Sequence, residues 1–182
     1  MWSSVTIPGR PSILVIDASR NLAGWEHDFM DQFFSSLKRS QLQLIGEAPV
    51  RLDQIQELEP FLSQQFNCMI LFSYGEQLKT DWRWLQAHPN LSPKVFAACM
   101  CEFYDDEITS VILQSPQTFA PIAVVPQSSA TPRETGLFLL KFFTELNLHS
   151  QDNISGKMAW FSFSKATALL KKRRYTAKFA LR

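Results

Sequence analysis

Two apolar segments of the chain end in residues that could do chemistry. The segment Cys68–Ser73 is followed by Tyr74-Gly75-Glu76, and the segment Lys94–Met100 is followed by Cys101 and Glu102. A cysteine sulfur becomes a nucleophile when a neighbouring base or cation favours its thiolate form. The layout therefore indicates a cysteine-nucleophile site with Cys101 as the candidate nucleophile.

These segments belong to an alternation of short apolar runs and amphipathic helical patterns that extends through all 182 residues. The alternation predicts a single α/β domain, a three-layer sandwich with a mainly parallel sheet of about six strands. The strands are expected at Ile13–Ile16, Leu42–Ile45, Cys68–Ser73, Lys94–Met100, Ile122–Val125 and Tyr175–Leu181. Helices are expected over about 15 residues from Trp25, at Ile55–Leu62, from Asp105 to Ile112, from the capping box at Thr131–Glu134, and over Lys157–Lys172. The stretches Gln77–Leu91 and Asn147–Gly156 are expected to be loops, the first with a short helix.

Sites in open parallel sheets form just beyond the carboxyl ends of the strands. The residues Tyr74, Gly75, Cys101 and Glu102 all follow such ends, and Asp17 ends the first strand. We therefore expect them at one edge of the sheet.

At this point the chain resembles a family, the caspase-like fold of the clan CD cysteine peptidases and especially the bacterial CHAT domains. In that family one strand ends in His-Gly, and the next ends in Ala-Cys-Glu, where the cysteine is the nucleophile. Phe72–Glu76 is similar to the first motif and Pro93–Glu102 to the second. The later segments, Ala120–Val125 with its capping box, Phe163–Leu170 and Lys178–Leu181, are similar to the family's remaining elements in order.

The resemblance implies that the histidine before the glycine activates the thiol, and this chain has Tyr74 there. A phenol with a pKa near 10 is protonated at neutral pH, so it is a poor general base and cannot form a stabilising cation. Three alternatives stay open for Cys101: a structural thiol, a reactive but non-hydrolytic thiol, or a nucleophile activated by another histidine. The candidates for that histidine are His88 and His27, whereas His149 is expected far from the site.

Other site types have less support. Asp17 after an apolar strand is typical of a receiver-like signalling domain, which would also need an aspartate after the third strand, where Ser73 and Tyr74 stand. No cysteine or histidine pair has zinc spacing, and six glycines form no phosphate-binding loop. We therefore expect no metal and no cofactor.

The composition narrows the choice of partners. The net charge of +1 gives no global case for nucleic acid or membrane, and no apolar run approaches the length of a membrane span. Three unevenly spaced cysteines and the absence of a signal-peptide pattern favour a cytoplasmic protein. A protein partner or a larger complex is expected. Trp82 and Trp84 either anchor this partner from a loop or are buried in the core. The basic run Lys171, Lys172, Arg173 and Arg174 either offsets a helix dipole or docks an acidic partner or a nucleic acid. A single run of this kind is weak evidence for nucleic acid.

The sequence thus predicts a caspase-like module that has lost peptidase chemistry and acts as a protein-binding or regulatory subunit. An active cysteine peptidase with a relocated histidine and a receiver-like domain are the alternatives.

Overall fold

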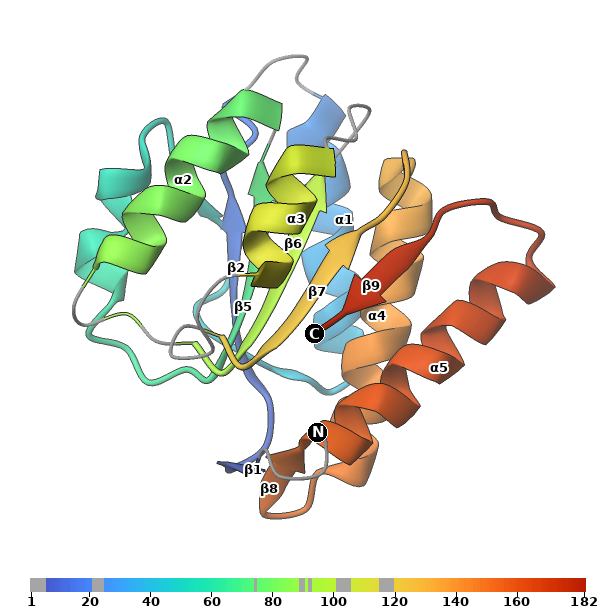
Figure 1. Cartoon of the computed structure of the whole chain (residues 1–182). Coiled ribbons are helices and arrows are strands. Elements are labelled where there is room, and N and C mark those ends of the chain that lie inside the picture. Colours follow the sequence, from blue (N-terminus) through green and yellow to red (C-terminus); the bar gives the residue numbers. More distant parts are fainter. Residues whose placement is uncertain are drawn as a thin grey trace.

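The structure is a computed structural model of the chain, and it describes residues 6–20, 25–73, 75–88, 91, 93–100, 106–114 and 120–182 (Figure 1). Its strands are β1 (Thr6–Pro8), β2 (Ser12–Asp17), β3 (Gln43–Leu44), β4 (Val50–Arg51), β5 (Cys68–Ser73), β6 (Val95–Met100), β7 (Ile122–Pro126), β8 (Asn153–Ser155) and β9 (Phe179–Leu181). Its helices are α1 (Trp25–Arg39), the 3₁₀ helix η2 (Ile55–Phe61), α2 (Gly75–Ala87), α3 (Asp106–Gln114), α4 (Pro132–His149) and α5 (Gly156–Lys172).

The main sheet has the strand order β3-β2-β5-β6-β7-β9, and β4 also pairs with β2. Because β3 pairs with the start of β2 and β4 with its end, they share one edge position, so six positions span the sheet. All pairs are parallel except β7 with β9, which is antiparallel. The prediction of a mixed α/β fold with a mainly parallel sheet is confirmed.

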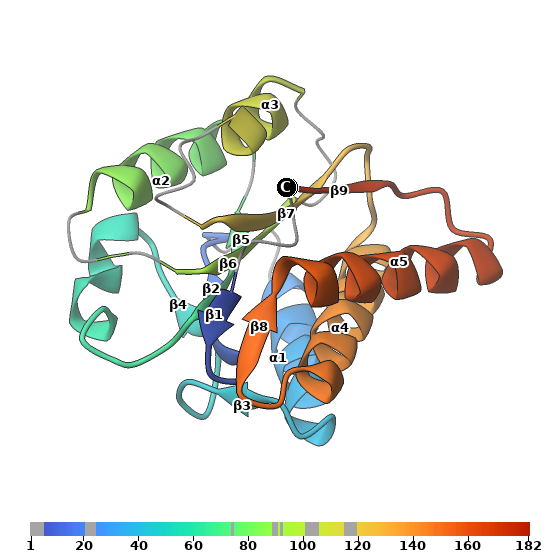
Figure 2. The same cartoon turned by 60° about the horizontal axis from the view of Figure 1, so that its bottom comes forward.

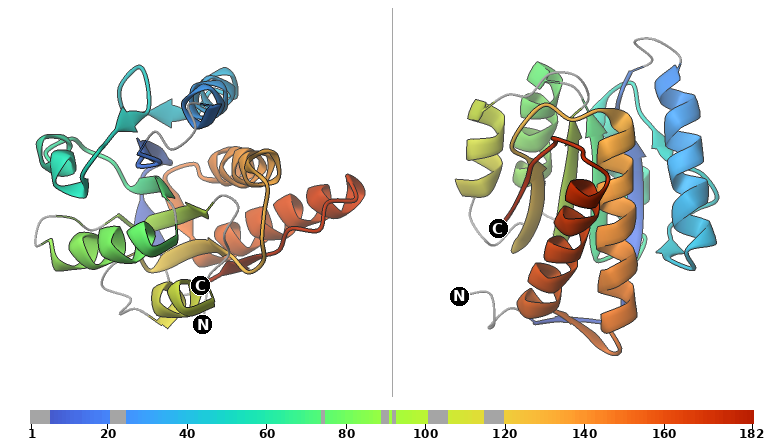
Figure 3. Two further views of the ribbon diagram at one scale, coloured as in Figure 1. Left: turned by 90° about the horizontal axis from the view of Figure 1, so that it is seen from above. Right: turned by 90° about the vertical axis from the view of Figure 1, so that its right-hand side faces the viewer.

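Helices cover both faces of this sheet (Figure 3). One hydrophobic core lies between the sheet and α1, α4 and α5, and the other lies between the sheet and α2, α3 and η2. Alternate residues of β2 supply the two cores: Ile13 and Val15 pack in the first, and Leu14 and Ile16 in the second. Burial on both faces explains why the central strands are continuous apolar runs.

The helix starts agree with local sequence signals. The Thr131 hydroxyl accepts a hydrogen bond from the Glu134 amide, and the Glu134 carboxylate accepts one from the Thr131 amide, so the predicted capping box is confirmed. Ser155 caps α5 in a similar way through the amide of Met158. α1 has the predicted length of 15 residues.

The prediction for Gln77–Leu91 was wrong, because α2 is a regular helix of 13 residues. Its buried side chains Leu78, Trp82 and Leu85 recur at helical spacing and pack on the sheet. Asn147–Gly156 was also not a simple loop, because β8 within it pairs with β1 in a separate two-stranded sheet.

Candidate functional site

The carboxyl ends of β2, β5 and β6 meet at one edge of the sheet. Asp17 is opposite Phe72, and Ser73 is opposite Met100, so the three strands end at nearly the same level. Helix α2 starts at this edge with Gly75, and the strands that precede the predicted site are direct neighbours, as expected. The predicted site residues Tyr74, Cys101 and Glu102 themselves lie outside the described residues.

A buried polar cluster occupies this edge. Its members are the carboxylates of Asp17 and Asp81, the hydroxyls of Ser19 and Ser73, all at most 1% exposed, and the guanidinium of Arg20. Charged groups are rarely buried unless they are paired, because desolvation costs several kcal/mol for each ion. The partners of these groups therefore decide what the edge can do.

Asp81 of α2 has the densest set of partners. The guanidinium of Arg20 donates to both of its oxygens, at 3.1 Å from Nη1 and 2.8 Å from Nη2. Ser73 donates its hydroxyl hydrogen at 2.9 Å, and Gln77 donates at 3.3 Å from Nε2. A carboxylate has about four acceptor positions, so these four donors saturate Asp81.

Arg20 is held as firmly as its partner. Its Nη1 also donates to the carbonyl of Ala18 at 2.7 Å, and its Nε donates to the carbonyl of Asp53 at 2.9 Å. Its backbone has a φ of 58°, a left-handed conformation that is uncommon for a residue with a side chain. The ion pair and these two carbonyl contacts hold the turn after β2 in place and link it to α2.

Asp17 is paired in a second arrangement. Its Oδ1 accepts hydrogen bonds from the amide and the hydroxyl of Ser19, at 3.1 and 2.6 Å. Its Oδ2 lies 3.5 Å from Nε of Arg51, whose Nη2 is 2.8 Å from Asp31. The Asp17 carboxylate is therefore paired with a guanidinium. Across the described part of the chain, no group of three His, Cys, Asp or Glu side chains could hold a metal ion.

The histidine proposed to replace the missing base is poorly placed. His88 follows the last residue of α2, its carbonyl accepts a hydrogen bond from Leu91, and β6 begins at Val95. It therefore lies near the amino end of β6, about 17 Å of strand away from Met100, the residue before Cys101. Its Nε2 is 2.9 Å from a Glu59 oxygen. This position speaks against His88 as a catalytic partner, because a base must come within hydrogen-bond reach of the thiol.

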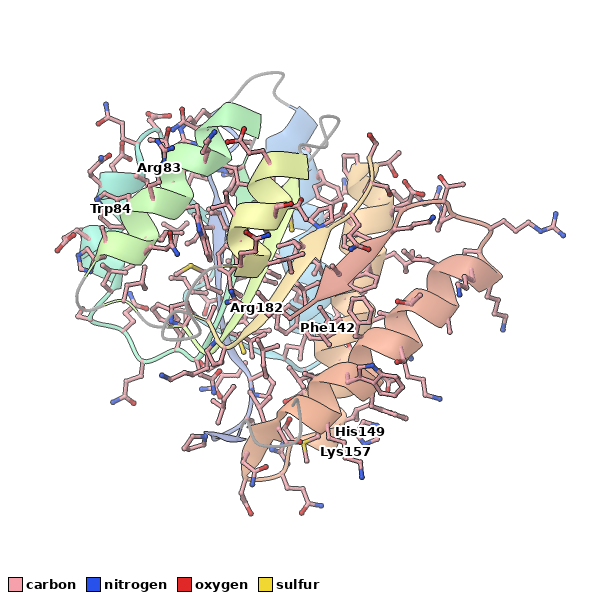
Figure 4. All side chains as sticks on the ribbon, in the orientation of Figure 1. Arg83, Trp84, Phe142, His149, Lys157 and Arg182 are labelled. Carbon is pink, nitrogen blue, oxygen red and sulfur yellow. The ribbon has the colours of Figure 1, made fainter. Side chains whose placement is uncertain are left out.

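The other two histidines lie on helices α4 and α1. His149 ends α4 at the opposite end of the molecule, 3.4 Å from Glu145, as predicted (Figure 4). His27 lies in the first turn of α1, and its side chain is outside the described part of the chain.

Two of the three cysteines are structural. Cys68 and Cys99 are buried in β5 and β6 at 0% and 1% exposure. Burial raises the pKa of the Cys68 thiol well above its usual range, so this sulfur stays protonated.

The predicted partner-binding residues separate into two groups. Trp82 was wrongly assigned to a binding surface: it is 1% exposed and its ring lies 5.0 Å from that of Phe96, because it faces the sheet from α2. Trp84, labelled in Figure 4, is half-buried: it packs against the edge of the second core, and its ring lies 5.0 Å from that of His88. The basic run Lys171, Lys172, Arg173 and Arg174 is exposed at the end of α5, and its role in binding stays a prediction.

Sequence reasoning missed Arg20, Arg51 and Asp81. The only available signal was the polar turn that follows Asp17, and nothing in the sequence pairs that turn with a residue of α2 that is 61 positions away. Geometry alone shows that these charges neutralise one another.

Comparisons with protein-family models and with curated proteins found no match to this chain. None of the helices in the described ranges combines the length and the apolar character needed to span a membrane.

Proposed function

We propose that this chain is a catalytically inactive caspase-like module, similar in plan to CHAT domains, that acts by binding a protein partner. The order of strands and helices along the sheet supports this proposal, as do the neighbouring strands β5 and β6 that precede Tyr74 and Cys101.

One observation carries the inactive assignment. Asp17 and Asp81, the two carboxylates of the polar cluster at the carboxyl edge, are each committed to an arginine and a serine. Neither of the two described histidine side chains lies at that edge. Together with a phenol at position 74, this means that no side chain described at this edge is placed to make a thiolate from Cys101, whose ordinary pKa is about 8.5.

The binding role is supported by exposed apolar side chains on α4 and α5. Leu148 is 68% exposed, Trp160 57% and Phe161 38%. Exposed apolar side chains mark a protein contact when they form a contiguous patch. A module with this face and an inert thiol would work as a regulatory or scaffolding subunit.

The test measures the reactivity of Cys101 in the native protein with iodoacetamide between pH 6 and 8.5, followed by mass spectrometry of the modified peptide. An ordinary thiol should react about 150-fold faster at pH 8.5 than at pH 6, because its thiolate fraction rises by that factor. Cys68 and Cys99 are the internal controls, because their burial should keep both unmodified.

A fluorogenic peptide library is assayed in parallel with the wild-type chain and with Cys101→Ala. We expect no cleavage by either. Rapid alkylation at pH 6, or cleavage that Cys101→Ala abolishes, would overturn the proposal in favour of an active peptidase. Loss of that activity in His27→Ala would then identify the relocated base.

A further inference from the structure

A groove lies on the α4 and α5 face of the sheet, and the turn after β7 at the carboxyl edge forms part of it. Its lining residues come from the turn after β7, from α4, from the second half of α5 and from the segment that leads into β9. Figure 2 shows these elements. Its volume is about 890 Å³, within the range of pockets that hold ligands. We call it the α5 groove.

The floor of the α5 groove is aromatic. The ring of Phe138 stacks on that of Phe179 with centroids 4.1 Å apart, and Phe163 meets Phe138 edge-on at 5.5 Å. Leu170 and the half-buried Tyr175 extend this apolar surface. The floor therefore suits an apolar side chain of a ligand.

One wall of the groove is fixed by internal hydrogen bonds. The backbone amides of Thr176 and Ala177 donate to Oε1 of Glu134, at 3.2 and 3.3 Å, and the amide of Lys178 donates to the Ser128 hydroxyl at 2.8 Å. Three successive backbone donors are thus already used. A ligand here is recognised by side chains and not by pairing with the backbone of this wall.

Glu134 also contributes no free negative charge to the groove. It is 6% exposed, and its Oε2 accepts from both the amide and the hydroxyl of Thr131. Burial raises the pKa of the Glu134 carboxyl, but the hydrogen bonds from Thr131, Ala177 and Thr176 outweigh it and hold this pKa below its usual range.

The rim of the groove is basic. Lys171 and Lys178 are exposed lining residues, none of the lining residues is acidic, and Lys172, Arg173 and Arg174 directly follow Lys171. From residue 157 to residue 182 the sequence holds eight Lys and Arg residues and no Asp or Glu. A basic rim around an apolar floor is complementary to an apolar side chain between acidic ones.

We propose that the α5 groove binds an acidic peptide segment of a partner protein, with one large apolar side chain on the floor and carboxylates at Lys171 and Lys178. This inference rests on the proposed function, since it names the partner chemistry of a binding module.

A peptide fits these observations better than a nucleic acid does. Single-stranded nucleic acids stack their bases on free aromatic faces, whereas Phe138 and Phe179 are buried and stack on each other.

The test uses the full chain and a fluorescein-labelled heptapeptide with a central phenylalanine between three acidic residues on each side. Fluorescence anisotropy measures its dissociation constant, and amide chemical shifts locate its contacts. We expect shifts at 127–129 and 167–179, and weaker binding at high salt, because exposed charges are screened.

Two pairs of charge reversals make the matched comparison. Lys171→Glu with Lys178→Glu should weaken binding about tenfold or more, because two attractive contacts become repulsive. Lys157→Glu with Lys165→Glu alters exposed α5 residues that do not line the groove and should leave binding unchanged. Thr167→Trp, which fills the groove from its α5 wall, should abolish binding.

Several outcomes would overturn the inference. One is that the two charge-reversal pairs lose the same amount of affinity for the peptide. Another is that a peptide with alanine at its centre binds as tightly as the phenylalanine peptide. A third is that an oligouridylate binds at the same residues more tightly than the peptide does. A dimer that buries the groove without peptide would assign the groove to a second copy of this chain. The experiments also distinguish the two proposals. Peptide binding together with cleavage through Cys101 would refute only the proposal that the chain is catalytically inactive. An unreactive Cys101 without peptide binding would refute only the proposal for the α5 groove.

Discussion

The polar cluster at the carboxyl edge makes a quantitative prediction for Asp81→Asn. The carboxylate is 0% exposed and accepts two hydrogen bonds from Arg20, one from Ser73 and one from Gln77. The side-chain amide of asparagine has no charge to balance the guanidinium. Its NH₂ group would also face one of the hydrogen-bond donors that the carboxylate now accepts from. Removing one partner of a buried ion pair costs about 3–5 kcal/mol, because the other charge stays buried and uncompensated.

Urea unfolding followed by tryptophan fluorescence measures this loss, and the buried Trp82 next to position 81 makes the signal sensitive to the cluster. With a urea dependence of about 2 kcal/mol per molar, the midpoint should fall by roughly 1.5–2.5 M. The matched control is Glu107→Gln, which removes a more exposed ion pair with Lys79 at 2.8 Å and should cost about 0–1 kcal/mol.

A double-mutant cycle decides whether the cost comes from the pair. Replacing Arg20 and Asp81 together by leucine removes both charges, so the double variant should be more stable than Asp81→Leu alone. If Asp81→Asn costs no more than the Glu107→Gln control, or if the Arg20 and Asp81 substitutions simply add, the account of a locked cluster is wrong.

Three further changes test other parts of the structure. Trp82→Ala should cost about 3–5 kcal/mol of unfolding free energy and Trp84→Ala about 1 kcal/mol or less in the same urea experiment; similar costs would contradict the packing of α2. Arg182→Ala should cost about 1.5–3 kcal/mol of unfolding free energy, because the Arg182 guanidinium donates to the carbonyls of Ile112 and Ala120 at 2.8 and 2.6 Å. A loss of unfolding free energy below about 0.5 kcal/mol would refute this anchoring of α3. The lowered pKa of Glu134 means that its stabilisation is present above the ordinary value of about 4.5 and is lost as pH falls through the folded pKa. A plot of unfolding free energy against pH should therefore be flatter below pH 4.5 for Glu134→Gln than for the wild type. Parallel curves would contradict the hydrogen-bonded state of Glu134.

The central strands and long helices were predictable because their signals are local. Cys68–Ser73 is an uninterrupted apolar run that the structure reproduces as β5 residue for residue. The capping box at Thr131 fixed the start of α4 in the same way. In contrast, β1, β4 and β8 have two or three residues each, which is too short to show a period.

The polar cluster could not be predicted, because it depends on which distant elements the fold brings together. Arg20 and Asp81 look like ordinary surface residues in the sequence, and only the packing of α2 beside the turn after β2 buries them together. Trp82 was misplaced for a related reason: the prolines near it suggested a loop, whereas Leu78, Trp82 and Leu85 carry the helical period.

The two faces of the sheet suggest a division of roles. On the α2 face, the charges of Arg20 and Asp81 neutralise each other inside the protein, which stabilises the carboxyl edge and leaves these groups unavailable for chemistry. On the α5 face, Lys171 and Lys178 are exposed beside an apolar groove whose own acid, Glu134, is already bonded. Among the described residues, the exposed lysines of the groove lie on α5 and before β9. Binding at the α5 groove is therefore the activity that we propose to test first.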